Sequence, residues 1–246
     1  MRVALAVNQI TGDIEGNKKD ILEMVGLSVD NRTELILFPE AAVTGLINND
    51  DPKHDLRLGL PIPGEFTNSL CQLADRCNIH IGIGLLEREN GKLFDSAVLI
   101  SPEKGVILKY RRITKGWHGK KADTSVYGHG DEIGLIRTEI GSFSFLICGD
   151  LFCDELGQDV RRLRPDYLLL PFARSFEEGV INQDRWHKEE KFVYAKRVES
   201  AGVTTLMVNS LGIDGSFGGA MIVDPSGEIR FELDVGKDDI LFADLT

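Results

Sequence analysis

Three segments of the sequence place a reactive or charged side chain where a predicted strand ends. Glu40 follows the apolar run that stops at Phe38-Pro39, Arg112 closes a strand predicted to start at Val106, and Cys148 comes directly after an apolar run. Loops at strand ends are held by a rigid sheet and open into a crevice, so they commonly carry chemistry. A thiol in such a turn can be activated by backbone N–H groups and by a neighbouring base. The set predicts a nucleophile, a base and a cation.

Each of the three residues also has a structural interpretation. A cysteine after an apolar strand is commonly a small buried hydrophobe. Glu40 could cap a turn, and Arg112 could be a solvated strand end. No residue of the three identifies a site alone, so the functional hypothesis depends on their order along the chain.

That order resembles the nitrilase, or carbon–nitrogen hydrolase, superfamily. In the family a glutamate closes an apolar strand in a motif like Phe-Pro-Glu, and the nucleophile lies in a motif like Ile-Cys-x-Asp. The matching segments here are Phe38-Pro39-Glu40 and Ile147-Cys148-Gly149-Asp150, accompanied by Val7-Asn8-Gln9, Thr44-Gly45, Asn209–Gly212 and Gly218–Gly227. The resemblance runs nearly end to end. It implies an α/β fold, a four-layer α-β-β-α sandwich of two mixed β-sheets flanked by helices.

The resemblance also implies an activity. A member of this family is expected to be a cysteine-dependent hydrolase of non-peptide C–N bonds in a small-molecule amide, carbamoyl compound or nitrile, acting through a thioester. Cys148 would be the nucleophile and Glu40 the general base, while Arg112 and the N–H of Gly149 would stabilise the oxyanion. No metal and no organic cofactor is expected.

One position departs from the family pattern. The family's catalytic lysine sits in a motif like Tyr-Arg-Lys, and the matching residue here is Arg112. Side chains alternate along a strand, so Lys109 shares a face with Arg111 and not with Arg112. Lys115 in the next loop could reach back instead. A second glutamate that the family often carries in this loop is absent between residues 113 and 130.

The exchange limits what this position can do. Arginine supplies positive charge and donors to an oxyanion, but with a pKa above about 12 it does not give up a proton. Glu40 would then carry all proton transfers. The alternative function is therefore a catalytically impaired family member that acts as a ligand- or protein-binding module.

Residues at two further loops are candidates for substrate binding. The long irregular segment 113–130 holds Trp117, which lines the pocket or simply packs the loop. After the strand predicted at 167–170 come Phe172 and Arg174, and in the resembled fold this loop borders the substrate. Arginine is suited to a bidentate grip on a carboxylate, so Arg174 predicts a substrate with a carboxylate near the scissile bond. The alternative is a surface pair of Arg174 with Glu177 or Glu178.

The elements that position these residues alternate between strands and helices, with hairpins such as the Asn-Gly turn at 89–92 between strands.

The length of 246 residues and the absence of a linker or repeat favour one domain over residues 1–246. The formal net charge of −11 opposes binding to nucleic acid or anionic membrane, and no apolar run approaches the roughly 20 residues of a membrane span. The four cysteines lack the C-x-x-C spacing of a zinc or redox site. Four cysteines in a chain of this length are not expected to form a disulfide framework, which favours a reducing, cytoplasmic location. The resemblance also implies that the protein forms a homodimer or a larger homo-oligomer.

Overall fold

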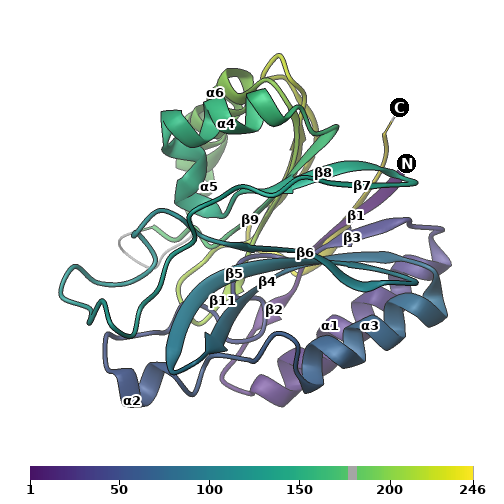
Figure 1. Ribbon diagram of the computed structural model, residues 1–246. Helices are drawn as coiled ribbons and strands as arrows, with labels where there is room; N and C mark the ends of the chain where they lie inside the picture. The colour runs from purple at the N-terminus through teal and green to yellow at the C-terminus, as the bar shows by residue number, and fades with distance from the viewer. Residues whose placement is uncertain (177–181, 246) are drawn as a thin grey trace.

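The computed structural model, which describes residues 1–176 and 182–245, has the predicted four layers. Two six-stranded sheets pack face to face, α1 and α3 cover the outer face of one sheet, and α4 and α6 cover the outer face of the other (Figure 1). Both sheets are mixed, because each combines parallel and antiparallel pairs. The predicted α-β-β-α sandwich is therefore confirmed.

The first sheet contains, in spatial order, β14 (Asp239–Asp244), β1 (Arg2–Val7), β3 (Leu35–Leu37), β4 (His80–Glu89), β5 (Lys92–Ser101) and β6 (Gly105–Arg111). The second contains β13 (Ile229–Leu233), β12 (Ala220–Val223), β10 (Thr204–Asn209), β9 (Tyr167–Phe172), β8 (Gly141–Phe145) and β7 (Ile136–Thr138). A short pair joins β2 (Gln9–Ile10) to β11 (Leu211–Gly212).

The long helices are α1 (Ile14–Asp30), α3 (Glu65–Cys77), α4 (Asp154–Leu163) and α6 (Lys191–Ala201), and the short ones are α2 (Pro52–Asp55) and α5 (Gln183–Arg185). The 3₁₀ helix η1 (Cys148–Phe152) follows β8 after two residues, and the π-helix η2 (Trp186–Glu190) joins α5 to α6. The helical segment from Gln183 to Ala201 thus consists of three consecutive pieces with a π turn in the middle.

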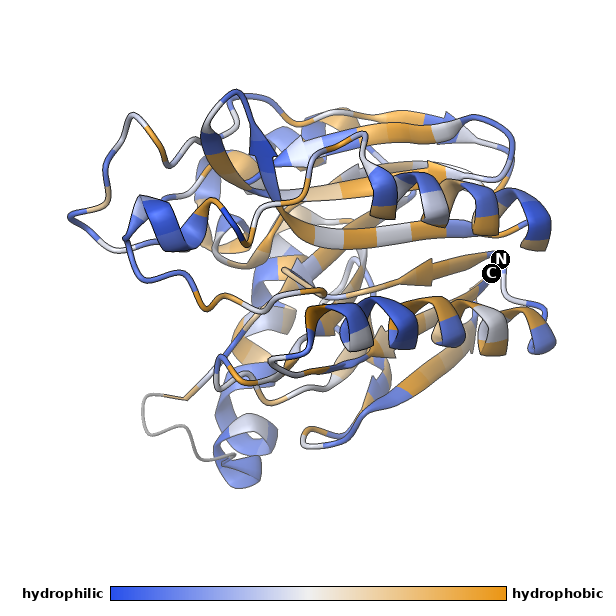
Figure 2. Ribbon diagram, turned by 90° about the horizontal axis from the view of Figure 1, so that it is seen from below, coloured by the Kyte–Doolittle hydropathy of each residue, from blue (hydrophilic) through white to orange (hydrophobic). Residues whose placement is uncertain are grey.

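Strand alternation divides the core into two parts. Val3, Leu5 and Val7 of β1 face the second sheet, whereas Ala4 and Ala6 face the helices. Successive side chains of a strand point to opposite faces, so a strand covered on both faces is apolar throughout. In Figure 2, which looks from the side of α1 and α3, these helices carry hydrophilic stripes and the strands behind them are mainly hydrophobic.

Two predictions from composition can be compared with the fold. Among the described residues, no helix is long and apolar enough to span a bilayer. All four cysteines are free thiols, in agreement with the expectation that they form no disulfide framework.

Candidate active site

Glu40 is fully buried in the turn that follows β3. The next residue, Ala41, has a left-handed φ of +47°, and β4 passes very close behind. A Cβ atom on Gly84 would lie 2.6 Å from the Cα of Glu40, while the N–H of Gly84 donates to the carbonyl of Pro39 at 3.1 Å. The glycine therefore allows β4 to hold the backbone of the predicted base in place.

Arg112 lies one residue beyond β6 and is 4% exposed. Its Nη1 donates to Oε1 of Glu40 at 2.9 Å and lies 3.4 Å from Oδ2 of Asp95, while its Nε donates to the hydroxyl of Thr114 at 3.1 Å. Burial acts to lower the pKa of Arg112, but the negative charge of Glu40 and its neighbours outweighs it and raises the pKa. The guanidinium is therefore a fixed positive charge beside Glu40.

The other cations considered at this position point elsewhere. Lys109 and Arg111 both bind Glu87 on the opposite face of the sheet, at 2.7 Å each. Lys115 is exposed. The predicted division of faces is confirmed: Arg112 is on the side of Glu40, and Lys109 is not.

Asp95 of β5 is a site residue that the sequence predictions missed. It is buried, and burial followed by the negative charge of Glu40 and a hydrogen bond with Glu40 raises its pKa well above the usual range. Glu40 Oε2 and Asp95 Oδ1 have no conventional donor among the described residues. A proton shared between the two carboxyls satisfies both atoms. The feature of the sequence that could have revealed Asp95 is a carboxylate inside an apolar strand, because a buried carboxylate needs a partner.

Cys148 is partly exposed and begins η1 with a φ of +46°, a left-handed conformation that is uncommon for a residue with a side chain. Burial, followed by the negative charge of Glu40, raises the pKa of the thiol to about 12, against the opposing charge of Arg112. Both charges therefore act on the sulfur. At neutral pH the resting group is a thiol rather than a thiolate.

Asp150 joins the elements around this turn. Its buried carboxylate accepts a hydrogen bond from the hydroxyl of Tyr110 at 2.6 Å and from the N–H groups of Thr114 and Ile147 at 2.8 and 3.2 Å. The aspartate of the Ile-Cys-x-Asp segment thereby ties β6, the following loop and the start of η1 together. This explains how the turn holds Cys148 near Arg112.

The thiol opens into a cavity of about 470 Å³. The cavity is lined by Cys148, Gly149, Phe152, Arg174, Arg185, Glu189, Glu190, Val193 and Tyr194. Arg174 binds Glu190 through two nitrogens, Nε at 3.0 Å and Nη2 at 2.9 Å, and Arg185 binds the same carboxylate at 2.7 Å. The alternative partners predicted for Arg174, Glu177 and Glu178, lie outside the described residues.

Of the four residues predicted to bind substrate, two line this cavity and two do not. Gly149 and Arg174 line it. Phe172 is fully buried behind Tyr194, with ring centroids 5.3 Å apart. Trp117 is 4% exposed and packs against Tyr127 within the long loop, in a separate hydrophobic cluster.

Comparisons with known proteins identify the family of the chain. The model of the carbon–nitrogen hydrolase family matches residues 2–246. An (R)-stereoselective amidase from Pseudomonas sp. is 25% identical over 85% of this chain and 71% of its own length, and the deaminated glutathione amidase of Dictyostelium discoideum is 24% identical over 99% and 87%.

Solved structures share the fold at low identity. A carbon–nitrogen hydrolase from Helicobacter pylori G27 superposes with a TM-score of 0.85 at 19% identity, covering 99% of this chain and 88% of that one. A mutant amidase from Nesterenkonia sp. AN1, with acrylamide added at its active-site cysteine, has a TM-score of 0.79 at 19% identity and covers 100% and 93%. The family match over nearly the whole length decides the assignment: the chain belongs to the carbon–nitrogen hydrolase family.

Proposed function

We propose that this protein hydrolyses the C–N bond of a small-molecule amide through a thioester on Cys148. The observation that supports this most directly is the placement of the thiol. It opens into a cavity, and the charges of the carboxylate of Glu40 and the guanidinium of Arg112, which are hydrogen-bonded to each other, both act on it. A nucleophile, a base and a fixed positive charge are the groups that acyl transfer needs.

The proposed reaction has two halves. Glu40 takes the proton of Cys148 as the sulfur attacks the carbonyl carbon, and the same proton leaves with ammonia or an amine as the thioester forms. Glu40 then removes a proton from water as the water oxygen attacks the thioester carbon. The C–S bond breaks, the carboxylic acid product leaves, and Glu40 returns the proton to the sulfur, which restores the thiol. Arg112 and the N–H of Gly149 stabilise the negative oxygen in each half. No metal or cofactor takes part in this scheme.

Because the pKa of the Cys148 thiol is raised, a base is needed to remove its proton, and Glu40 has this role. With a pKa of about 12, Cys148 does not store a thiolate in the resting enzyme. The nucleophile forms only when Glu40 accepts the proton, and Arg112, whose pKa is raised, stays charged while it does so. Proton transfer and attack are therefore coupled, which protects the thiol from other electrophiles.

A second candidate function follows from the residue at position 112. If proton transfer in this family member required the lysine that Arg112 replaces, the protein would bind ligands or a partner protein without turnover. Release of ammonia from a pool of small amides separates the two functions, because a binding module releases none. Adduct formation alone does not separate them.

Substrate class and assembly are further parts of the proposal. Arg174 lines the cavity, which supports a substrate with a carboxylate near the scissile bond.

Phe192 and Val193 of α6 are 54% and 52% exposed beside the cavity, which supports pairing of two copies through this helix. Sedimentation that shows a monomer at micromolar concentration would contradict the dimer. The four free thiols support a reducing, cytoplasmic location.

The test is mass spectrometry of the protein after rapid acid quenching in the presence of amide substrates. We expect an acyl adduct on the peptide that contains Cys148, and steady-state release of ammonia. Cys148→Ala should lose both and stay folded. Cys153→Ala, five residues away on the surface side of η1, should lose neither. An adduct on another cysteine, or turnover by Cys148→Ala, would exclude the proposed nucleophile.

A further inference from the structure

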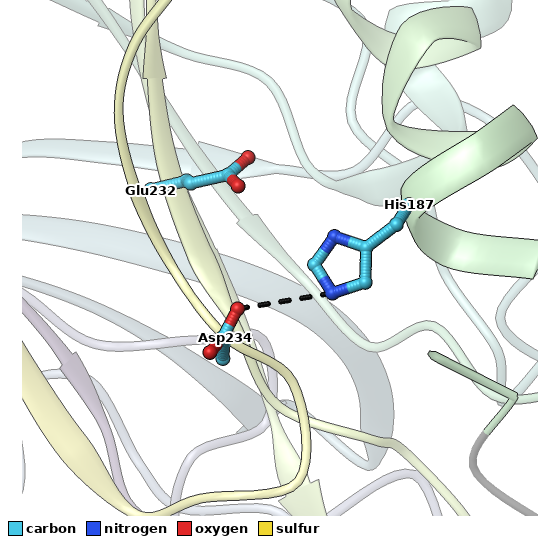
Figure 3. A group of neighbouring side chains, drawn as sticks. All are labelled: His187, Glu232 and Asp234. Atoms are coloured by element: carbon cyan, nitrogen blue, oxygen red, sulfur yellow. Dashed lines mark ion pairs between the residues drawn. The ribbon is translucent and has the colours of Figure 1, made fainter. Parts of the chain in front are cut away.

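A cluster of potential metal ligands lies outside the catalytic cavity, between the π-helix and the sheet. His187 belongs to η2, Glu232 to β13, and Asp234 follows that strand. One ligand atom from each lies within 4.8 Å of the others, and Nε2 of His187 is 3.7 Å from Oδ1 of Asp234. Figure 3 shows both ring nitrogens of His187 turned toward the strand, with a carboxylate on either side.

Lys191 is the cation that now occupies part of this cluster. Its Nζ donates to the two oxygens of Glu232 at 2.7 and 3.0 Å and lies 3.5 Å from Nδ1 of His187. The ammonium therefore binds one of the two carboxylates, and among the described residues Asp234 has only the imidazole as a partner. A divalent cation would match the charge of both carboxylates, which the single ammonium does not.

We propose that His187, Glu232 and Asp234 bind a divalent first-row transition-metal ion, with Zn²⁺ as the best fit. Imidazole suits Zn²⁺ and its neighbours, whereas Mg²⁺ and Ca²⁺ prefer sites made of oxygen alone. Three protein ligands leave a position for water, since Zn²⁺ is commonly four-coordinate. The three ligand atoms, which lie within 4.8 Å of one another, must move closer together to share one ion at the roughly 2 Å bond lengths of Zn²⁺.

The metal and Lys191 exclude one another. While Lys191 donates to Nδ1, the ring proton of neutral His187 is on Nε2 and points at Asp234. Coordination through Nε2 moves that proton to Nδ1, which then cannot accept from the ammonium. Glu232 likewise gives up its bonds to Lys191 when it binds the ion. Metal binding therefore releases Lys191 to solvent.

The site has a structural consequence for the cavity. Glu189 and Glu190, which line the cavity, belong to the same π turn as His187. A single π turn within a helix is an uncommon conformation that is frequent at functional sites. An ion shared by η2 and β13 would fasten this turn to the second sheet and slow its local opening.

Isothermal titration calorimetry with Zn²⁺ tests the proposal on the wild type and three variants. His187→Gln removes the nitrogen ligand, and we expect it to lose one binding site or at least about tenfold in affinity. Lys191→Met removes the competing cation and should bind about two- to fivefold more tightly. His118→Gln is the matched control, because His118 lies in the long loop with its Nε2 3.2 Å from that of His129, and it should bind as the wild type does.

Hydrogen exchange gives a second readout that does not depend on catalysis. Zn²⁺ should slow amide exchange over residues 186–190 in the wild type and leave it unchanged in His187→Gln. Equal numbers of ions bound with equal affinity by the wild type and His187→Gln would overturn the proposal, because any thiol sites are common to both. Loss of the site in His118→Gln instead would move it to the long loop and overturn it as well.

Discussion

Two buried charge networks lie on opposite faces of the β4–β5–β6 hairpins. On one face the carboxylates of the buried Glu87 and the partly exposed Glu89 bind two cations, Lys109 and Arg111. Ser96 also donates a hydrogen bond to Glu87. On the other face Glu40 and Asp95 are two carboxyls that share one guanidinium, that of Arg112. Arg111 and Arg112 are neighbours in the chain, but the first belongs to a network with one cation for each carboxylate and the second to a network with one cation for two carboxyls.

The pKa values record the difference. Burial would raise the pKa of Glu87, but its hydrogen bonds from Arg111, Lys109 and Ser96 lower it below the usual value. Burial, and then the charge of Glu40, raises the pKa of Asp95 well above its usual value. Burial alone does not decide the direction; the number of donors does. A carboxylate with surplus donors is a structural anchor, whereas a carboxyl pair with too few donors can accept a proton.

Glu40→Gln breaks the catalytic network and should have the largest effect. Loss of the general base should lower turnover by about 10²- to 10⁴-fold. The charge of Glu40 also raises the pKa of Cys148, so the variant should have a lower thiol pKa. The pH profile of iodoacetamide labelling at Cys148, followed by mass spectrometry, should shift to lower pH while amide hydrolysis is lost.

Glu87→Gln is the matched control for this experiment. It removes a buried carboxylate from the same hairpins but from the other face, so the labelling profile of Cys148 should not move and turnover per folded molecule should be kept. A labelling profile that is unchanged in Glu40→Gln would contradict the electrostatic coupling of Glu40 to the thiol.

Glu87→Gln should instead destabilise the fold, by about 1.5–3 kcal/mol of unfolding free energy. The exposed Lys109 and the half-buried Arg111 then keep only Glu89 as a carboxylate partner. The folded pKa of Glu87 lies below its unfolded value near 4.5. Its contribution is therefore present above about pH 4.5 and is lost as the pH falls through the folded pKa. Urea unfolding should show a gap between wild type and variant that narrows below pH 4.5; a constant gap would mean that ionisation of Glu87 is not its source.

Asp95→Asn should have a smaller effect with the opposite pH dependence. The folded pKa of Asp95 is raised, so its contribution to stability is present below the unfolded value and is lost as the pH rises through the folded pKa. Asparagine copies the protonated form and keeps a donor to Glu40. We expect unfolding free energy at pH 8 equal to or above that of the wild type, and activity reduced by about two- to tenfold, the value of one hydrogen bond.

The control for this variant is Asp95→Ala, which removes the donor as well. It should lose more activity than Asp95→Asn because an oxygen of Glu40 is then left without its partner. If Asp95→Asn is instead strongly destabilised at pH 8, Asp95 is ionised in the folded protein and the shared proton is excluded.

The sequence predicted those features that depend on local pattern. Strands such as β1 and the β4–β5 hairpin followed from apolar runs and the Asn-Gly turn, and the facing of Arg112 away from Lys109 followed from strand alternation. Features that depend on which strands become neighbours could not be predicted. Asp95 joins Glu40 only because β3, β4 and β5 lie side by side.

The π turn and the partner of Arg174 are two further features that could not be predicted from the local sequence pattern. Helical periodicity does not distinguish an α turn from a π turn of five residues, so the sequence pattern could not reveal η2. Glu190, the partner of Arg174, is 16 residues away along the chain and reaches it through that turn. The sequence offered the nearer Glu177 and Glu178 as alternatives instead.

The smallest predicted effect concerns Arg174 and a carboxylate on the substrate. An unoccupied arginine clamp would favour a free carboxylate over its methyl ester by about 1.5–3 kcal/mol. Because Glu190 already binds two nitrogens of Arg174, we expect the wild type to favour the acid only about two- to threefold in kcat/KM. Arg174→Ala should remove the preference and Glu190→Gln should increase it, since the guanidinium is then free to bind substrate. Arg185→Ala, which removes the other arginine bound to Glu190, is the control and should leave the preference in place. If Glu190→Gln treats acid and ester alike, Arg174 anchors the cavity wall and does not bind the substrate.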